Sequence, residues 1–254
     1  MFGMGMIMTR GCASRLLILS ANGNLRALLS GLVFAVTVQA SISGLLAPAR
    51  QWVTGLWMVE GGPERNLLHF TGAWVGLAVG LALGAIGLWR LRADTQDNSQ
   101  TWNWAGVLVG VSIALGWGFT QLVASVSFEP VPVQSLSFSS PSAEWLMRTL
   151  STATAPSFGF DAGLLPGVFA GSLIAGVLFG DFKFEGFQTE NKLGHYLTGA
   201  ILMGFGAVMA GGCTVGSGIT GGAIFSNTAW LTLVSIIAGA GLTYKFLKSI
   251  NSPT

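Results

Sequence analysis

Apolar segments of about 20 residues alternate with shorter polar segments along the whole 254-residue chain. A helix needs roughly 20 apolar residues to cross the core of a bilayer. These segments are continuously apolar and rich in Gly, Ala and Leu, whereas the strands of a transmembrane barrel alternate apolar and polar residues. The pattern therefore predicts an all-α polytopic membrane protein. The predicted spans are 26–47, 68–91, 103–125, 163–180, 194–213 and 229–247.

The composition agrees with this prediction. Charged residues make up 9% of the chain, against roughly 25% in soluble domains, and the mean hydropathy is +0.65. The net charge of +2 gives no basic face for a nucleic acid. The two cysteines form no C-x-x-C pair, so we expect no metal site and no cofactor. His69 and His195 each begin a predicted span, where an interfacial position explains them more simply than ligation does.

Lysine and arginine residues in short loops favour the cytoplasmic side of a membrane. Four groups of these residues can all lie on the cytoplasmic side in one topology. These are Arg10, Arg15 and Arg26; Arg90 and Arg92; Lys183 and Lys192; and Lys245 and Lys248. The Ser- and Pro-rich segment 126–162 is then external, with a short interfacial helix around 142–150. The loop 48–66 conflicts with this topology, because it carries two arginines and must also face outward.

Two stretches near opposite ends of the chain resemble each other. Residues 3–12 read GMGMIMTRGC and residues 204–213 read GFGAVMAGGC. The matching pairs are Gly3/Gly204, Gly5/Gly206, Met8/Met209, Gly11/Gly212 and Cys12/Cys213. In the topology above the two copies run in opposite senses, which is the inverted-repeat arrangement of many transporters. We therefore expect a single transmembrane domain, 1–254, with repeat halves of about 1–92 and 163–254 and a site near the midplane.

The stretch 211–222 contains six glycines, each of which lowers helix stability by about 0.5–1 kcal/mol relative to alanine. We expect the helix to break just after Cys213 and to leave irregular backbone at membrane depth. Such backbone must be buried in protein or line a cavity, and its free N–H groups would attract an anion. Thr214, Ser217 and Thr220 would add hydroxyl donors. The alternative is close helix packing through small residues, which we prefer for 76–87.

A single buried cysteine is usually just a small apolar side chain, but two cysteines at equivalent repeat positions favour a functional role. Apolar surroundings disfavour a thiolate, so we expect neutral S–H groups, which are weak donors suited to a sulfur-bearing ligand. Arg10 and Arg15 flank Cys12 and either draw an anion inward or anchor the segment at the interface. The predicted spans have no Asp or Glu in their middle, which argues against a proton pump.

The stretches GMGMIMTRGCASRLLILSANGNLRALL (3–29) and GAILMGFGAVMAGGCTVGSGITGG (199–222) resemble the paired signatures of the YeeE/YedE family of sulfur-transport membrane proteins. The resemblance implies an hourglass-like fold in the bacterial inner membrane and uptake of thiosulfate. It also implies that membrane cysteines line the path, with Cys12 and Cys213 as two of them. Members of the family have membrane segments and a further cysteine ahead of the first signature. The chain is therefore expected to be shortened, to have a misplaced gene start, or to lack the first relay position.

The resemblance implies transport of a small sulfur-containing anion, thiosulfate, through a central path. The expected partners are the lipid bilayer, the sulfur oxyanion and a cytoplasmic sulfur-carrier protein. The alternatives are transport of another sulfur or a selenium compound, a membrane thiol or sulfur-transfer enzyme that uses both cysteines covalently, and a structural membrane subunit. The path residues that we expect are Cys12, Cys213, Gly11, Gly211, Gly212, Thr214, Gly216, Ser217, Gly218, Arg10 and Arg15.

Overall fold

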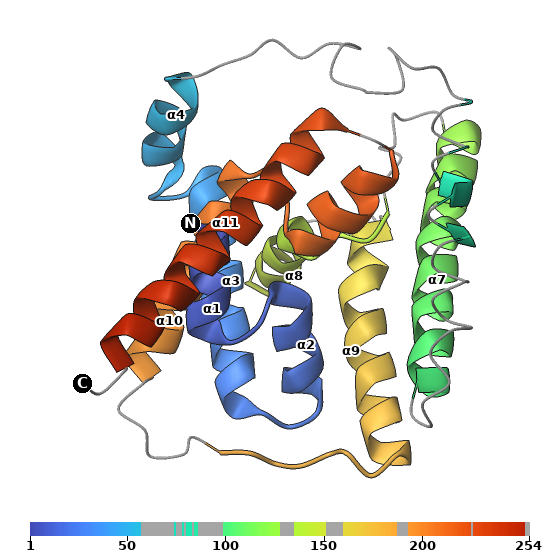
Figure 1. Cartoon of the computed structure of the whole chain (residues 1–254), viewed down its shortest axis with the longest axis horizontal. Coiled ribbons are helices and arrows are strands. Elements are labelled where there is room, and N and C mark those ends of the chain that lie inside the picture. Colours follow the sequence, from blue (N-terminus) through green and yellow to red (C-terminus); the bar gives the residue numbers. More distant parts are fainter. Residues whose placement is uncertain are drawn as a thin grey trace. The chain divides into compact units, whose positions relative to one another are not determined.

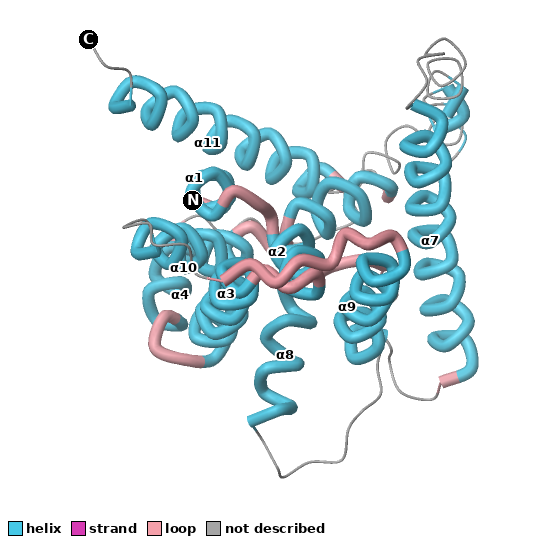
Figure 2. The backbone as a smooth tube through the Cα atoms, turned by 90° about the horizontal axis from the view of Figure 1, so that it is seen from below, coloured by secondary structure: helices cyan, strands magenta, loops and turns pink. Residues whose placement is uncertain are grey.

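The structure is a computed structural model that describes residues 1–56, 74, 78, 80–82, 84–85, 99–127, 135–150, 160–186, 193–224 and 226–251 (Figure 1). Almost all of this described backbone is helical (Figure 2). Within it, four segments are long and apolar enough to cross a membrane: Leu25–Ser43, Ala105–Val126, Phe160–Leu178 and Asn227–Ser249. The prediction of an all-α polytopic membrane protein is confirmed. The predicted span 68–91 lies largely outside the described residues.

The described helices follow the chain in a simple order. They are α1 (Phe2–Thr9), α2 (Ala13–Ala21), α3 (Leu25–Ser43), α4 (Ala47–Gly55), α7 (Ser99–Val126), α8 (Ser139–Leu150), α9 (Phe160–Leu178), α10 (Leu193–Met209), the π-helix η2 (Gly216–Gly221) and α11 (Asn227–Asn251). Two spans end earlier than predicted. The chain leaves α3 at Gly44, shortly before α4, which has Pro48 in its first turn. Helix α10 stops at Met209 because the backbone turns left-handed at Gly211.

The chain divides into two compact units. The first contains Met1–Val59, Ser137–Ile219 and Leu231–Thr254, and the second contains Glu60–Leu136 and Thr220–Trp230. In the first unit α10 packs against α1 and α3, and α2 packs against α3 and α9. Its core is formed by side chains such as Phe34 and Val38 of α3 and Met203 of α10. Both cysteine motifs therefore belong to the first unit.

Glycines allow α1 and α10 to cross at backbone distance. A Cβ atom on Gly206 would lie 2.8 Å from Phe2 Cα, and one on Gly5 would lie 2.6 Å from Met203 N. At the other end of α1, a Cβ atom on Gly199 would lie 3.0 Å from Thr9 Cγ2. The start of α1 thus lies beside the end of α10, and the end of α1 lies beside its start. The two helices run antiparallel.

A second pair of glycines joins each short helix to a long one. A Cβ atom on Gly3 would lie 2.8 Å from the Ala240 nitrogen of α11. The aligned glycine of the other motif, Gly204, packs against α3, where a Cβ atom would lie 2.8 Å from Thr37 Cβ. Each signature helix therefore contacts the long apolar helix that follows the other signature.

The predicted short helix around 142–150 is α8, and it is not an isolated surface helix. Ala143 is buried between α8 and its neighbours, and Trp145 Nε1 donates a 2.8 Å hydrogen bond to the Ala162 carbonyl of α9. Arg148 and Glu144 form an ion pair one helical turn apart. These contacts fix α8 against α3 and α9 inside the first unit.

The turn between α2 and α3 pairs with the segment that follows α9. Lys183 N donates to the Asn22 carbonyl at 3.3 Å, and Glu185 N donates to the Gly23 carbonyl at 3.1 Å. Asn24 caps α3 by accepting a 3.0 Å hydrogen bond from Ala27 N. The predicted topology placed these two segments on the same side of the membrane, and the structure places them in contact.

The second unit contains α7, whose leucines 108, 115 and 122 are each about two-thirds exposed. Polar groups in this unit bond to backbone carbonyls. Ser135 Oγ donates to Ile113 at 3.1 Å, and Thr220 Oγ1 donates to Leu136 at 2.7 Å. An exposed apolar helix face of this kind is the surface that a span presents to lipid.

Candidate functional site

The first motif is a helix break at residues 10–12. Arg10 adopts a left-handed conformation with φ of 58°, and its N–H donates to the Ile7 carbonyl at 3.3 Å. Gly11 N donates to the Met6 carbonyl at 3.1 Å. This pair of hydrogen bonds is the Schellman motif that ends many helices. Cys12 then takes an extended conformation and is the N-cap residue of α2.

The second motif ends α10 in the same way. Gly211 is left-handed with φ of 71°, and its N–H donates to the Val208 carbonyl at 3.3 Å. Gly212 N donates to the Ala207 carbonyl at 2.9 Å. Cys213 follows in a non-helical conformation, and helical backbone resumes at residue 214. All five residues named here occupy positions aligned with those of the first break.

The break position differs from the prediction by a few residues. We expected irregular backbone after Cys213, whereas the irregular residues are 210–213 and the chain is helical from 214 to 223. The left-handed Gly211 ends α10 before the cysteine. The later glycines do not interrupt the backbone again, because residues Gly216–Gly221 widen into a π-helix. Such π-helical turns are frequent at functional sites.

Each cysteine begins a new helix. The first hydrogen bond of the next helix runs from Leu16 N to the Cys12 carbonyl, at 3.0 Å, and from Ser217 N to the Cys213 carbonyl, at 2.8 Å. The N–H groups at the start of a helix lack acceptors within it and carry positive partial charge. Both thiols are free. Each break therefore combines a cysteine side chain with the positive end of a helix.

Cys213 lies in the core of the first unit and is 1% exposed. Gly216 N lies 3.5 Å from its Sγ atom in hydrogen-bonding geometry. Ser217 is also buried, and a Cβ atom on Gly212 would lie 3.2 Å from its Oγ. Thr214 and Gly216 are half-buried beside them. Gly218 packs on α11, where a Cβ atom would lie 3.2 Å from Leu233 Cδ1. Of the residues expected near Cys213, Gly216 and Ser217 contact it directly.

Cys12 is half-buried and has different neighbours. Its Sγ lies 3.1 Å from Ser14 Oγ. The methylene groups of Arg15 cover Gly11, where a Cβ atom would lie 3.2 Å from Arg15 Cδ, and the Arg15 side chain is exposed. The two breaks share their backbone geometry but not their side chains.

Two arginines gather on one buried tyrosine near the first break. The guanidinium carbons of Arg10 and Arg26 lie 6.0 Å and 4.5 Å from the centre of the Tyr196 ring. These are cation–π distances. Among the described residues, neither arginine has a carboxylate partner. Arg26 and Tyr196 were not predicted, since they are joined to the motif only by the packing of α3 and α10.

The two breaks lie at opposite ends of the antiparallel α1/α10 pair. Thr9, just before the first break, lies beside Gly199 at the start of α10, and Phe2 lies beside Gly206 near its end.

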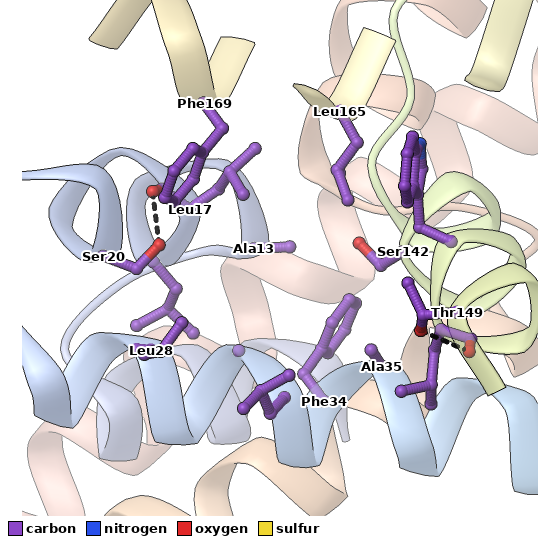
Figure 3. Close-up of a pocket in the computed structure, with 15 residues that line it drawn as sticks. Ala13, Leu17, Ser20, Leu28, Phe34, Ala35, Ser142, Thr149, Leu165 and Phe169 are labelled. Carbon is purple, nitrogen blue, oxygen red and sulfur yellow. Dashed lines mark hydrogen bonds between the residues drawn. The ribbon is translucent and has the colours of Figure 1, made fainter. Parts of the chain in front are cut away.

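A cavity of about 250 Å³ lies beside α2, between α3, α8 and α9 (Figure 3). Its polar side chains are already engaged. Ser20, Ser142 and Thr149 donate to backbone carbonyls, and Trp145 does the same. The rest of the wall is apolar, with Leu17, Phe34 and Phe169 pointing into it. This cavity offers few donors to an anion, so the candidate site stays at the breaks.

The long apolar helices define a polytopic membrane protein. The chain belongs to the sulphur-transport family, whose model matches residues 1–242, and this confirms the resemblance seen in the sequence. It is 24% identical over 251 residues to the thiosulfate transporter TsuA of Spirochaeta thermophila, covering 94% of this chain and 72% of the relative. It is 29% identical over 133 residues to the thiosulfate transporter TsuA of Escherichia coli, covering 52% of this chain and 35% of the relative. The chain is a transport protein and not an enzyme.

Proposed function

We propose that this chain carries thiosulfate across the bacterial inner membrane along a path that passes both helix breaks. The observation that carries the proposal is the shared geometry of the breaks. At each one a left-handed residue ends a helix, and a free cysteine begins the next. The relatives named thiosulfate transporters support the choice of substrate.

The chemistry of each break suits a sulfur oxyanion. The start of a helix attracts negative charge through its unpaired N–H groups, and a neutral thiol makes only weak contacts with a ligand's sulfur. Weak contacts at successive sites suit transport, because a ligand must leave each site as easily as it enters. Cys12 and Cys213 act as two such sites, and Gly11, Gly211 and Gly212 shape the backbone around them.

The contacts between the repeats support an inverted arrangement. Gly3 and Gly204 hold the two short helices against α11 and α3, while Gly5 and Gly206 form the antiparallel crossing. Inverted repeats place a transported ligand near the midplane, where interrupted helices meet. Arg10 and Arg15, beside the first break, attract the anion on the cytoplasmic side, where a soluble sulfur-carrier protein receives it.

Uptake in bacteria that lack other thiosulfate importers tests this function. Cells expressing the chain should grow on thiosulfate as the sole sulfur source and accumulate radiolabelled thiosulfate above the empty-vector control. Unlabelled thiosulfate should compete well, and sulfate poorly, because sulfate has no terminal sulfur for a thiol to contact. Failure to accumulate thiosulfate at confirmed membrane expression would contradict the proposal. If the cells accumulate a selenium compound and not thiosulfate, the substrate is a selenium compound.

A further inference from the structure

The cavity between α2, α3, α8 and α9 is large enough to hold part of an organic molecule. Its volume is about 250 Å³, whereas an apolar cavity of roughly 150 Å³ already binds benzene and stays free of water. Apolar walls that face no other atoms lose the dispersion contacts of a packed core. The size and the walls of this cavity therefore suit an apolar occupant.

The polar side chains in the wall already have hydrogen-bond partners. Ser20, Ser142 and Thr149 each donate to a backbone carbonyl, and Trp145 Nε1 donates to the Ala162 carbonyl at 2.8 Å. The other described residues of the wall are glycine, alanine, leucine and phenylalanine, so none of the described residues that line the cavity carries a charge. Nothing in this wall selects a polar or charged ligand.

The cavity opens on the lipid-facing side of two membrane spans. Leu28 and Leu32 of α3 are 40% and 48% exposed, and Phe169 of α9 is 37% exposed, although all three line the cavity. The exposed apolar surface continues beyond the cavity at Val36 of α3 and Leu173 of α9. Both helices are long and apolar enough to cross a membrane, and the exposed face of such a helix contacts lipid. The cavity is therefore continuous with the surface that faces the bilayer.

The cavity also lies at the depth of the acyl chains. Leu28 belongs to the first turn of α3, and Ala35 lies near the middle of that helix. Their separation of seven residues corresponds to about 10 Å along the helix axis. On the opposite wall, Phe169 lies near the middle of α9 and points into the cavity (Figure 3). A hydrocarbon chain in the membrane reaches this space without leaving an apolar environment, whereas water or an anion does not.

We propose that this cavity binds one acyl chain of a membrane phospholipid. The chain enters past the exposed Leu32 and Phe169 and lies along the first half of α3. Ala13 and Leu17 of α2 form part of the wall (Figure 3), and α2 is the helix that begins after Cys12. The bound chain therefore completes the packing around the helix that follows the first break. This lipid site is separate from the proposed transport path and does not depend on thiosulfate as the substrate.

Quenching of Trp145 fluorescence by brominated lipid tests the proposal. Wild-type protein and Trp145→Phe are reconstituted into vesicles of dioleoylphosphatidylcholine and into vesicles of the same lipid with bromine at the middle of its acyl chains. The chain contains nine tryptophans, so the difference between the two emissions isolates Trp145, which lines the cavity. Bromine quenches tryptophan only at close range. We expect the Trp145 emission to lose most of its intensity in the brominated vesicles.

Gly31→Phe is the variant that fills the cavity. Gly31 lines it, and an added Cβ would meet no heavy atom within 4 Å, so a phenyl ring has room to occupy the space of the acyl chain. The matched control is Gly171→Phe in α9, where an added Cβ also meets open space but away from the residues that line the cavity. Each variant is measured with and without Trp145→Phe. The quenching of Trp145 should be lost in Gly31→Phe and unchanged in Gly171→Phe.

Two results would overturn the proposal. An equal Trp145 emission from wild-type protein in both kinds of vesicle would show that no acyl chain reaches the cavity. Equal quenching in wild type and Gly31→Phe would place the lipid outside the cavity. If Gly31→Phe fails to fold, as judged by size-exclusion chromatography in detergent, the smaller Gly31→Leu replaces it, and wild-type quenching in that variant overturns the proposal.

Discussion

Arg10 and Gly211 adopt the same left-handed backbone conformation at aligned positions of two helix breaks, with φ of 58° and 71°. The hydrogen bonds around them also correspond, because both residues donate to the carbonyl three positions back. A left-handed conformation costs a non-glycine residue roughly 1–2 kcal/mol. The first break accepts that cost and places a cation over Tyr196, whereas the second uses glycine beside a buried thiol.

The left-handed turn predicts a clear effect of Gly211→Ala. No heavy atom lies within 4 Å of the added Cβ, so the backbone conformation alone should lower the free energy of unfolding, by roughly 1 kcal/mol. Gly171→Ala in α9 is the control, because its Cβ also meets open space but its backbone is helical. Thermal unfolding in detergent should show a lower midpoint for Gly211→Ala and an equal or higher one for the control. An equal decrease of the melting midpoint in Gly211→Ala and Gly171→Ala would argue against the left-handed turn.

The crossing of α1 and α10 predicts a larger effect of Gly206→Ala. Its Cβ atom would overlap the backbone of Phe2, which cannot move aside as a side chain can, and overpacking of this kind costs about 1–3 kcal/mol. We expect a lower melting midpoint and less monodisperse protein in size-exclusion chromatography. Gly194→Ala, on the same helix but facing open space, should behave like wild type. If both variants behave like wild type, the close crossing is wrong.

The sequence predicts the spans well because hydropathy acts over many residues. The ends of α7, α9 and α11 fall within a few residues of the predicted spans. Helix ends are less predictable, since they depend on a few backbone angles. Six glycines in 211–222 indicated a break, but only Gly211 is left-handed there, and a glycine count does not show which one turns the chain.

Burial predicts different reactivities for the two thiols. Cys12 is half-buried and Cys213 is 1% exposed, so N-ethylmaleimide should modify Cys12 about tenfold faster or more, because Cys213 reacts only after a local opening. Mass spectrometry of the resting protein measures both rates, with Cys12→Ala and Cys213→Ala used to assign the modified sites. Faster modification of Cys213 in the resting protein would contradict the packing around it.

The arginine pair on Tyr196 predicts that the aromatic face, and not the hydroxyl, stabilises the first break. Tyr196→Phe keeps the ring and should leave the melting midpoint unchanged. Tyr196→Leu removes both cation–π contacts, which are worth about 0.5–1 kcal/mol each at accessible sites, and should lower the midpoint. The comparison is made by thermal unfolding in detergent. If Tyr196→Phe lowers the melting midpoint as much as Tyr196→Leu does, the stabilisation comes from the tyrosine hydroxyl and not from the ring.

The candidate site is only partly visible in the sequence. The signatures predict Cys12, Cys213 and the glycines around them, because these residues are close together along the chain. Arg26 and Tyr196 come from other segments and reach the first break through helix packing. Contacts between segments far apart in the sequence can be identified only once the fold is known.

Uptake of radiolabelled thiosulfate into proteoliposomes by cysteine variants tests the central claim most directly. The variants are Cys12→Ala, Cys213→Ala and the double variant, with Ser235→Ala as the control because its hydroxyl donates to a backbone carbonyl on the exposed face of α11. We predict that each cysteine variant folds and inserts normally but loses most of its initial rate, and that Ser235→Ala transports like wild type. Wild-type rates in the double variant would contradict a path that depends on the two thiols.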